Sequence, residues 1–297
     1  MTIDPQRQQI LPGPDAASEY CRKSPSDLRC GGPRIVLENP RVSPPVTTAH
    51  LALAFLLARI SLVSAFRRSG LGPLWSSVGV LFTVSAVGLL FGTMLRSLLT
   101  NFDDYICTLA AGLVMWTFLS AVANDGAIAF ARWMPILRHS RISLPVIAMS
   151  VLLRHLPVLG LNIALLIAAQ YALLGRTAEA LPMLGAALLL VANIFWIGAL
   201  ALVLGARFRD IGQLVPATMQ IAFLLTPILW PPYFLGRFEY LLAFNPFYFQ
   251  FSVFTAAIAG LQAPPHHWAM AAGMALAGGG VTLGVYRWSQ PRWPYWI

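Results

Sequence analysis

The sequence predicts an all-α integral membrane protein with six transmembrane helices, and three observations support that fold class. Of its 297 residues, 58% are hydrophobic and 10% are charged, whereas soluble domains carry about 25% charged residues. The mean hydropathy is +0.69, so there is too little polar surface to cover the core of a soluble enzyme. The third observation is a series of almost uncharged stretches about twenty residues long, which is the length that an α-helix needs to cross a bilayer.

Six segments are predicted to span the membrane. They are Leu74–Leu95, Tyr105–Ala123, 155–174, Leu181–Leu204, Ile211–Trp230 and Trp268–Tyr286. Arg154 and His155 stand at the start of the third segment, and Pro216 and Pro227 interrupt the fifth. A helix of twenty residues is about 30 Å long, so segments of this length can cross the hydrocarbon core.

The residues before the first span divide into a polar tail and an apolar segment. Residues 1–48 contain eight prolines and little hydrophobic periodicity, which predicts a disordered cytoplasmic tail. Residues 49–66 are apolar but carry Arg59 near their centre, and an arginine there costs about 2.5–3.5 kcal/mol in a span. A helix lying on the cytoplasmic membrane surface is therefore favoured over a further span. The membrane domain is predicted over 49–290, with a short cytoplasmic tail over 291–297.

Between the fifth and sixth spans, the uncharged segment Tyr240–Ala263 could form a seventh span. Asn245-Pro246 divides it into pieces too short to cross, so the prediction is two short re-entrant helices, which are tolerated at membrane depth where protein covers them. Six spans and a cytoplasmic N-terminus leave three of the 20 basic residues outside, namely Arg96, Arg176 and Arg237. This excess of positive charge on the inner side predicts that both termini are cytoplasmic.

Several kinds of chemistry are excluded by motifs that the sequence lacks. A nucleotide-binding P-loop needs glycines before its lysine, but the only lysine, Lys23, has none near it. ATP hydrolysis is therefore not expected of this chain. Motifs of zinc proteases and serine hydrolases do not occur, and three cysteines without metal-ligand spacing predict no metal or cofactor site. The sequence pI of 10.1 reflects arginines clustered between apolar stretches, which indicates anionic lipid headgroups rather than nucleic acid.

Two arginine-containing segments between spans are predicted to lie on the cytoplasmic side. Asn124–Leu144, expected to be a loop, carries Arg132, Arg138 and Arg141. Gly205–Ile211 carries Arg207, Arg209 and Asp210. These residues either anchor the topology or contact a soluble ATPase, and composition favours neither interpretation. Asp210 is also expected to cap the helix that follows, because the N-terminal helix dipole favours an acid.

Four motifs occur in the order in which a family of transporters carries them. Arg67–Trp75 reads RRSGLGPLW, Ala111–Phe118 reads AGLVMWTF, Phe208–Ile211 reads FRDI with TPILW at Thr226–Trp230, and Asn245–Tyr248 reads NPFY. Over about residues 49–286, the chain resembles the permease subunits of type-2 ABC exporters. The similarity is strongest with those that move O-antigen, capsule or teichoic-acid chains.

The resemblance implies a homodimer of six-span subunits in a bacterial inner membrane, with two separate cytoplasmic ATPase subunits that bind ATP and Mg²⁺. It implies a cell-surface or lipid-linked polysaccharide as substrate, and an amphipathic interfacial helix before the first span. Two other classes stay open. One is a drug or lipid exporter permease of the same superfamily, and the other is a membrane-embedded transferase, which would need a reachable acid or histidine.

Aromatic residues on the second and fifth predicted spans are candidates to line the pathway of the polysaccharide that the resemblance implies. Sugar rings have apolar C–H faces that stack on aromatic rings, and weak stacking suits a polymer that must keep moving. The candidate pathway residues are Trp116, Phe118, Phe223, Trp230 and Tyr233. The alternative for each ring is packing in the core or anchoring at the membrane interface, where Trp and Tyr are enriched.

Overall fold

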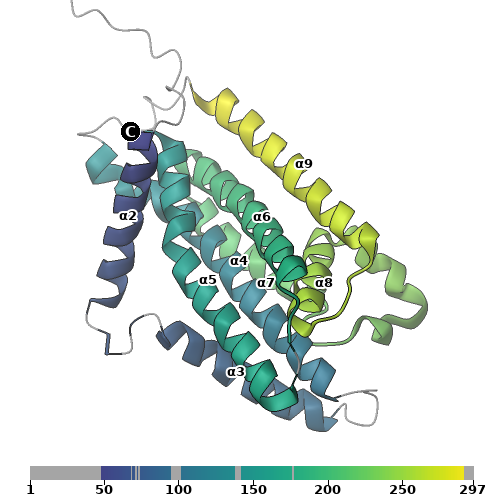
Figure 1. Cartoon of the computed structure of the whole chain (residues 1–297). Helices are drawn as coiled ribbons and strands as arrows, with labels where there is room; N and C mark the ends of the chain where they lie inside the picture. The colour runs from purple at the N-terminus through teal and green to yellow at the C-terminus, as the bar shows by residue number, and fades with distance from the viewer. Residues whose placement is uncertain are drawn as a thin grey trace, which may run out of the picture. The chain divides into compact units, whose positions relative to one another are not determined.

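A computed structural model describes residues 48–67, 69–70, 72, 74–94, 102–137, 142–175 and 177–290, and in these ranges the only regular secondary structure is helical. The helices are α2 (Thr48–Phe66), α3 (Leu74–Met94), α4 (Phe102–Leu137), α5 (Leu144–Leu174), α6 (Ala180–Arg207), α7 (Ile211–Leu225), the 3₁₀-helix η1 (Pro232–Phe244), α8 (Pro246–Ala259) and α9 (Pro265–Ser289) (Figure 1). The predicted tail over 1–48, apart from its last residue, and the tail over 291–297 lie outside the described residues.

Within the described ranges, five helices are long and apolar enough to cross a membrane, namely α3, α4, α5, α6 and α9. The predicted class, an all-α multi-pass membrane protein, is confirmed at this level. Helix α7 is apolar but has only 15 residues, so it covers the first part of the predicted fifth span. The chain leaves the helix at Thr226, directly before Pro227, because a proline disfavours helical geometry in the residue before it.

Helix α4 is the centre of the packing. It contacts α3, α5, α6, α7 and α8 (Figure 1). In the apolar stretch of α4 that could cross a membrane, 67% is buried inside the protein, whereas the value for α3 is 11%. The prediction of a loop over Asn124–Leu144 is wrong, because α4 continues as a helix to Leu137. Helix α5 likewise begins at Leu144 rather than near residue 155. The two helices are therefore about 54 and 46 Å long at 1.5 Å per residue, well beyond the thickness of a hydrocarbon core.

Helices α4 and α6 approach each other so closely that only glycine fits at several positions. A Cβ atom on Gly126 would lie 2.4 Å from the carbonyl oxygen of Gly198, and one on Gly205 would lie 2.1 Å from the carbonyl oxygen of Ala127. Small residues let helix backbones meet in this way inside membranes, where lipid tails offer no hydrophobic driving force between helices.

The segment between α7 and α9 contains a sharp bend. Helices η1 and α8 meet at 111°, and the break falls at Asn245, as predicted from Asn245-Pro246. The Asn245 side chain accepts a hydrogen bond from the Phe247 N–H at 3.0 Å, and its Nδ2 donates to the carbonyl oxygen of Leu225 and to Thr226 Oγ1, both at 3.1 Å. One side chain thus caps α8 and fixes the end of α7.

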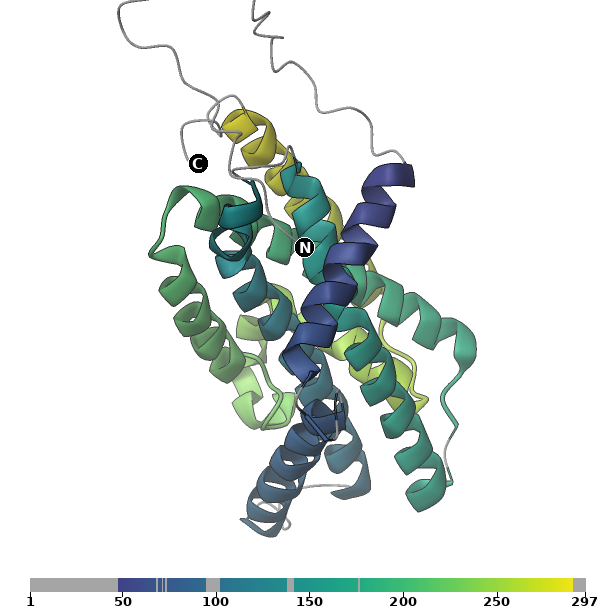
Figure 2. The same cartoon turned by 90° about the vertical axis from the view of Figure 1, so that its left-hand side faces the viewer.

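Helix α2 matches the predicted segment 49–66 and packs on α5 (Figure 2). Ala54, Leu57 and Ala58 are buried, and Ala54 and Leu57 form a small cluster with Val146 of α5. The rest of α2 exposes large apolar side chains together with Arg59. Its exposed face is therefore apolar rather than charged, in contrast to the amphipathic helix that the family resemblance implies.

A buried polar network joins α6, α8 and α9. The Asn193 Nδ2 of α6 donates to Gln250 Oε1 of α8 at 2.9 Å and to the carbonyl oxygen of Ala271 of α9 at 3.1 Å. Its Oδ1 accepts a hydrogen bond from Trp196 Nε1 at 3.1 Å. Asn193 is 1% exposed and Gln250 3% exposed, so loss of one partner would leave a buried polar group unpaired. The network therefore fixes the three helices relative to one another.

Gly126→Ala tests the close contact between α4 and α6. The added methyl group would meet the backbone of α6, so we expect a loss of roughly 1–3 kcal/mol in stability and a lower thermal midpoint in detergent, followed by fluorescence-detected size exclusion. The matched control is Gly273→Ala on α9, which has open space around it and should gain about 0.5–1 kcal/mol from helix propensity. Equal midpoints for the two variants would contradict the packing described above.

Candidate functional site

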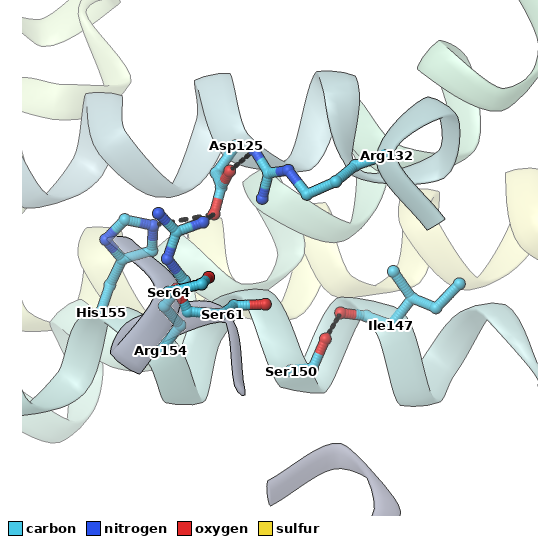
Figure 3. A network of polar contacts seen from close by, with 8 residues as sticks. All are labelled: Ser61, Ser64, Asp125, Arg132, Ile147, Ser150, Arg154 and His155. Atoms are coloured by element: carbon cyan, nitrogen blue, oxygen red, sulfur yellow. Dashed lines mark hydrogen bonds and ion pairs between the residues drawn. The ribbon is translucent and has the colours of Figure 1, made fainter. Parts of the chain in front are cut away.

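A charged cluster lies between α4 and α5, centred on Asp125 (Figure 3). The Arg154 Nη1 donates to Asp125 Oδ2 at 2.8 Å, and His155 Nε2 lies 3.1 Å from the same oxygen. The Arg132 Nη2 donates to Asp125 Oδ1. One carboxylate therefore holds two guanidinium groups and an imidazole, which come from two helices.

Helix geometry explains why these residues meet. Arg132 stands two turns after Asp125 on α4, so both project from the same face. Arg154 and His155 are neighbours on α5, the helix that packs beside this part of α4. The Asp125 side chain is 9% exposed, whereas those of Arg154 and Arg132 are 21% and 34% exposed. A buried carboxylate needs such partners, because an isolated charge in an apolar medium costs many kcal/mol.

The distances of the cluster from the far ends of α4 and α5 can be compared with the thickness of the hydrocarbon core. Asp125 lies about 35 Å from the start of α4 and Arg154 about 30 Å from the end of α5, at 1.5 Å per residue. Both distances are close to the thickness of a hydrocarbon core. If the opposite ends of α4 and α5 lie at one membrane boundary, the cluster therefore lies near the other.

A small cavity adjoins the cluster. It has a volume of about 200 Å³, and its lining includes His155, Phe118, Thr117 and Asn162. The Phe118 ring meets the His155 imidazole edge to face, with ring centroids 6.4 Å apart. The cavity thus presents one imidazole whose Nε2 is already held by a carboxylate, which leaves Nδ1 as its other hydrogen-bonding atom.

Metal binding is not supported by the described part of the chain, where no group of three or more His, Cys, Asp or Glu side chains has the geometry of a metal site. At the Asp125 cluster, two guanidinium groups would also repel a cation. The cluster can stabilise α4 against α5, and its two arginines exceed the single carboxylate in charge.

The predicted ATPase-coupling residues partly come together. Arg132 belongs to the cluster, while Arg138 and Arg141 lie outside the described residues. Gly205 packs on Ala127, and a Cβ on Gly212 would lie 3.2 Å from Ile128. The joint between α6 and α7, which carries Arg207, Arg209 and Asp210, therefore lies against the same part of α4 as the cluster.

Asp210 does not cap α7 with its side chain as expected. It stands at the N-cap position, but its carboxylate accepts no hydrogen bond from the first turn. The residue has helical φ and ψ of −69° and −18°, whereas a capping side chain needs extended backbone at this position. The Arg207 guanidinium lies 5.1 Å from the centre of the Phe208 ring, and Phe208, Arg209 and Asp210 are all exposed.

The five predicted pathway residues fall into three places. Trp116 is 7% exposed and packs against Phe223 and Phe247, each with ring centroids 5.6 Å away. Phe118 faces His155. Trp230 and Tyr233 line a separate cavity of about 210 Å³, beside which the Tyr105 hydroxyl donates to the Leu229 carbonyl oxygen at 2.9 Å. Trp116 and Phe118 are therefore core residues in this chain, and Trp230 and Tyr233 are accessible together.

The cluster was not predicted from the sequence. The expected loop at Asp125 and the expected start of a span at Arg154 and His155 gave no indication of their contact. The available signal was the spacing of Asp125 and Arg132, which are seven residues apart and share a helix face if the helix continues.

Comparison with models of known protein families and with curated proteins finds no match. The resemblance to ABC exporter permeases therefore stays a prediction from the sequence motifs.

A double-mutant cycle on Asp125 and Arg154 tests the cluster. Asp125→Ala leaves the guanidinium groups without a counter-charge, so we expect a loss of roughly 3–5 kcal/mol in mixed-micelle unfolding experiments. The double variant Asp125→Ala with Arg154→Ala should lose less than the sum of the single variants, with a coupling of about 0.5–3 kcal/mol. The control, Asp210→Ala, should change stability by less than about 0.5 kcal/mol. Additive single effects would show that the ion pair contributes nothing.

Proposed function

We propose that this chain is the permease subunit of an ATP-driven type-2 ABC exporter that moves a cell-surface or lipid-linked polysaccharide across a bacterial inner membrane. The observation that carries the proposal is the bent helix pair η1 and α8. It lies directly before the last candidate span, and its break falls at the NPFY motif. Sequence motif and backbone geometry thus coincide at Asn245-Pro246, where the sequence predicts a re-entrant pair.

In this proposal α7 is the fifth of six spans, and η1 and α8 form the re-entrant pair on the outer side. Helix α2 lies at the cytoplasmic surface, partly sunk among the lipid tails because its exposed face is apolar. The Asp125 cluster and the joint between α6 and α7 then lie on the cytoplasmic side, which agrees with the positive-inside bias of their arginines.

The proposed second copy of the chain has exposed apolar helices available to it. Helix α7 has no buried residue, and α3 is mostly exposed. Phe82 and Leu89 on α3 and Leu224 on α7 are all more than 60% exposed. These faces fit either lipid or the homodimer interface that the resemblance implies.

The energy source in this proposal is a separate cytoplasmic ATPase, since the sequence has no P-loop of its own. Arg207 and Arg209 are exposed beside the α4 segment that carries the Asp125 cluster. A force applied at the joint between α6 and α7 would pass to α4 through this contact, and to α5 through Asp125. The cluster would thus make α4 and α5 move together.

Isolation of the tagged chain from its native membrane tests the energy source. We expect a P-loop ATPase to co-purify in stoichiometric amount, and the chain alone to hydrolyse no ATP. Arg207→Glu combined with Arg209→Glu should lower ATPase recovery at least about tenfold, because two charge reversals at a binding surface each cost more than 1 kcal/mol. The control is Arg237→Glu, also exposed but in a predicted outer loop. Loss of the complex in the control alone would contradict the topology, and ATP hydrolysis by the clean chain would contradict the permease assignment.

A double substitution tests the substrate. Trp230→Ala combined with Tyr233→Ala removes both rings from one cavity, so surface polysaccharide should fall severalfold while the ATPase complex persists. These residues are better suited to the test than buried Trp116, whose loss would disturb the core. Trp288→Ala, a 63% exposed residue of α9, serves as the control. Unchanged surface glycan with an altered drug-resistance or lipid profile would favour an exporter of small molecules or lipids.

The pairing of Asp125 with His155 beside a cavity favours a second candidate, a membrane-embedded transferase. A carboxylate that orients an imidazole toward a cavity is an arrangement used for general acid–base catalysis. Transfer of radiolabelled sugar to a lipid acceptor by the purified chain, abolished in His155→Ala, would support this function. The absence of transfer, together with a co-purifying ATPase, would exclude it.

A further inference from the structure

A cavity of about 600 Å³ lies at the end of the bundle opposite the Asp125 cluster along α5 and α6, where the starts of α6 and α9 meet the end of α8. This volume lies within the range of ordinary small-molecule sites. Most of the lining is apolar, and its polar and aromatic members are Glu179, Gln262 and Trp268. It shares no lining residue with the cavity of Trp230 and Tyr233.

Tight backbone contacts form the walls. Gly260 ends α8 with a φ of +68°, and a Cβ there would lie 2.9 Å from the carbonyl oxygen of Thr177. The loop after α8 therefore lies directly against the loop before α6. A Cβ on Gly185 would lie 3.3 Å from Cζ3 of Trp268, so one edge of the indole rests on the backbone of α6.

The helices around the cavity are fixed to one another. His267 Nδ1 and Ser252 Oγ are 2.7 Å apart, which holds the first turn of α9 against α8. Further along the helices, Asn193 joins α6 to Gln250 of α8 and Ala271 of α9. Because these contacts fix all three helices, the cavity is formed before any ligand binds, which reduces the entropic cost of binding.

The polar and aromatic groups at the cavity select the class of ligand. Among its lining residues, Glu179 is the one ionisable side chain, so its negative charge disfavours phosphates and other anions. A fatty acyl chain would place apolar atoms against that carboxylate and make no use of its hydrogen-bonding capacity. An uncharged sugar satisfies all three groups, because its C–H face can stack on Trp268 while its hydroxyls donate to Glu179 and accept from the Gln262 amide.

We propose that this cavity is a binding site for an uncharged sugar unit, recognised by Trp268, Glu179 and Gln262. The site is separate from the pathway residues and requires no assumption about export. Its loops belong to the side that the sequence predicts to be outer, where an exported glycan or a surface glycolipid would be present.

Saturation-transfer NMR with maltotriose tests the proposal, using the full chain in phosphatidylcholine nanodiscs prepared without sugar-headed detergent. We expect saturable transfer to the C–H protons of the sugar, and affinity at least about tenfold weaker in Trp268→Ala. The matched control on the same helix is Trp288→Ala, which should bind like the unmodified chain. Glucose 6-phosphate should bind more weakly than glucose, and Glu179→Gln should reduce that difference.

Glu179→Gln and Gln262→Ala keep the test decisive if Trp268→Ala fails to fold. Glu179 makes no side-chain capping bond to α6, and Gln262 lies in an exposed loop position, so both variants should fold and bind maltotriose severalfold more weakly. The proposal would be overturned by absent transfer in the unmodified chain, by unchanged affinity in the folded variants, or by displacement of the sugar by oleate. None of these results bears on the co-purification of an ATPase, so the two proposals fail independently.

Discussion

The buried carboxylate of Asp125 is the interaction on which the central helix depends. A charged side chain within an apolar helix normally disfavours burial of that helix in the membrane, because transfer of the charge into hydrocarbon costs several kcal/mol. Here Arg132, Arg154 and His155 surround the carboxylate, so α4 continues as one helix of 36 residues. The contact also defines the pairing of α4 with α5, because two of the three partners come from α5.

Around this helix, close backbone contact replaces side-chain interdigitation. Gly126 and Gly205 bring the backbones of α4 and α6 together at distances that exclude a Cβ atom at either position. The same contact between α4 and α6 places the joint between α6 and α7 against the segment of α4 that carries Asp125. A displacement at this joint would therefore act on the backbone of α4 at Ala127.

The opposite end of the bundle is organised by hydrogen bonds rather than by charge. Asn193 connects three helices, and Asn245 caps α8 while it holds the end of α7. Both are amides whose donor and acceptor groups are in use, so each side chain restricts how the elements around it can pack. The bend at Asn245 and the cavity beside Trp268 both depend on these fixed helix ends. In the proposed exporter, the helices near Asp125 would be coupled to the ATPase. The opposite end of the bundle would hold the preformed sugar site.

Much of this architecture was determined by the sequence alone. The low charge and the apolar stretches of about twenty residues required membrane helices, and proline together with Asn245 required a break before α8. These are local properties of the chain, so periodicity and composition reveal them. The length of α4 and the start of α5 were decided by the tertiary structure. Local sequence places Asp125 in a loop, whereas its carboxylate in the structure contacts Arg154 and His155, about thirty residues away. No local pattern records that contact. The same is true of the cavity at Trp268, because Glu179, Gly185 and Trp268 meet only when α6 and α9 pack together.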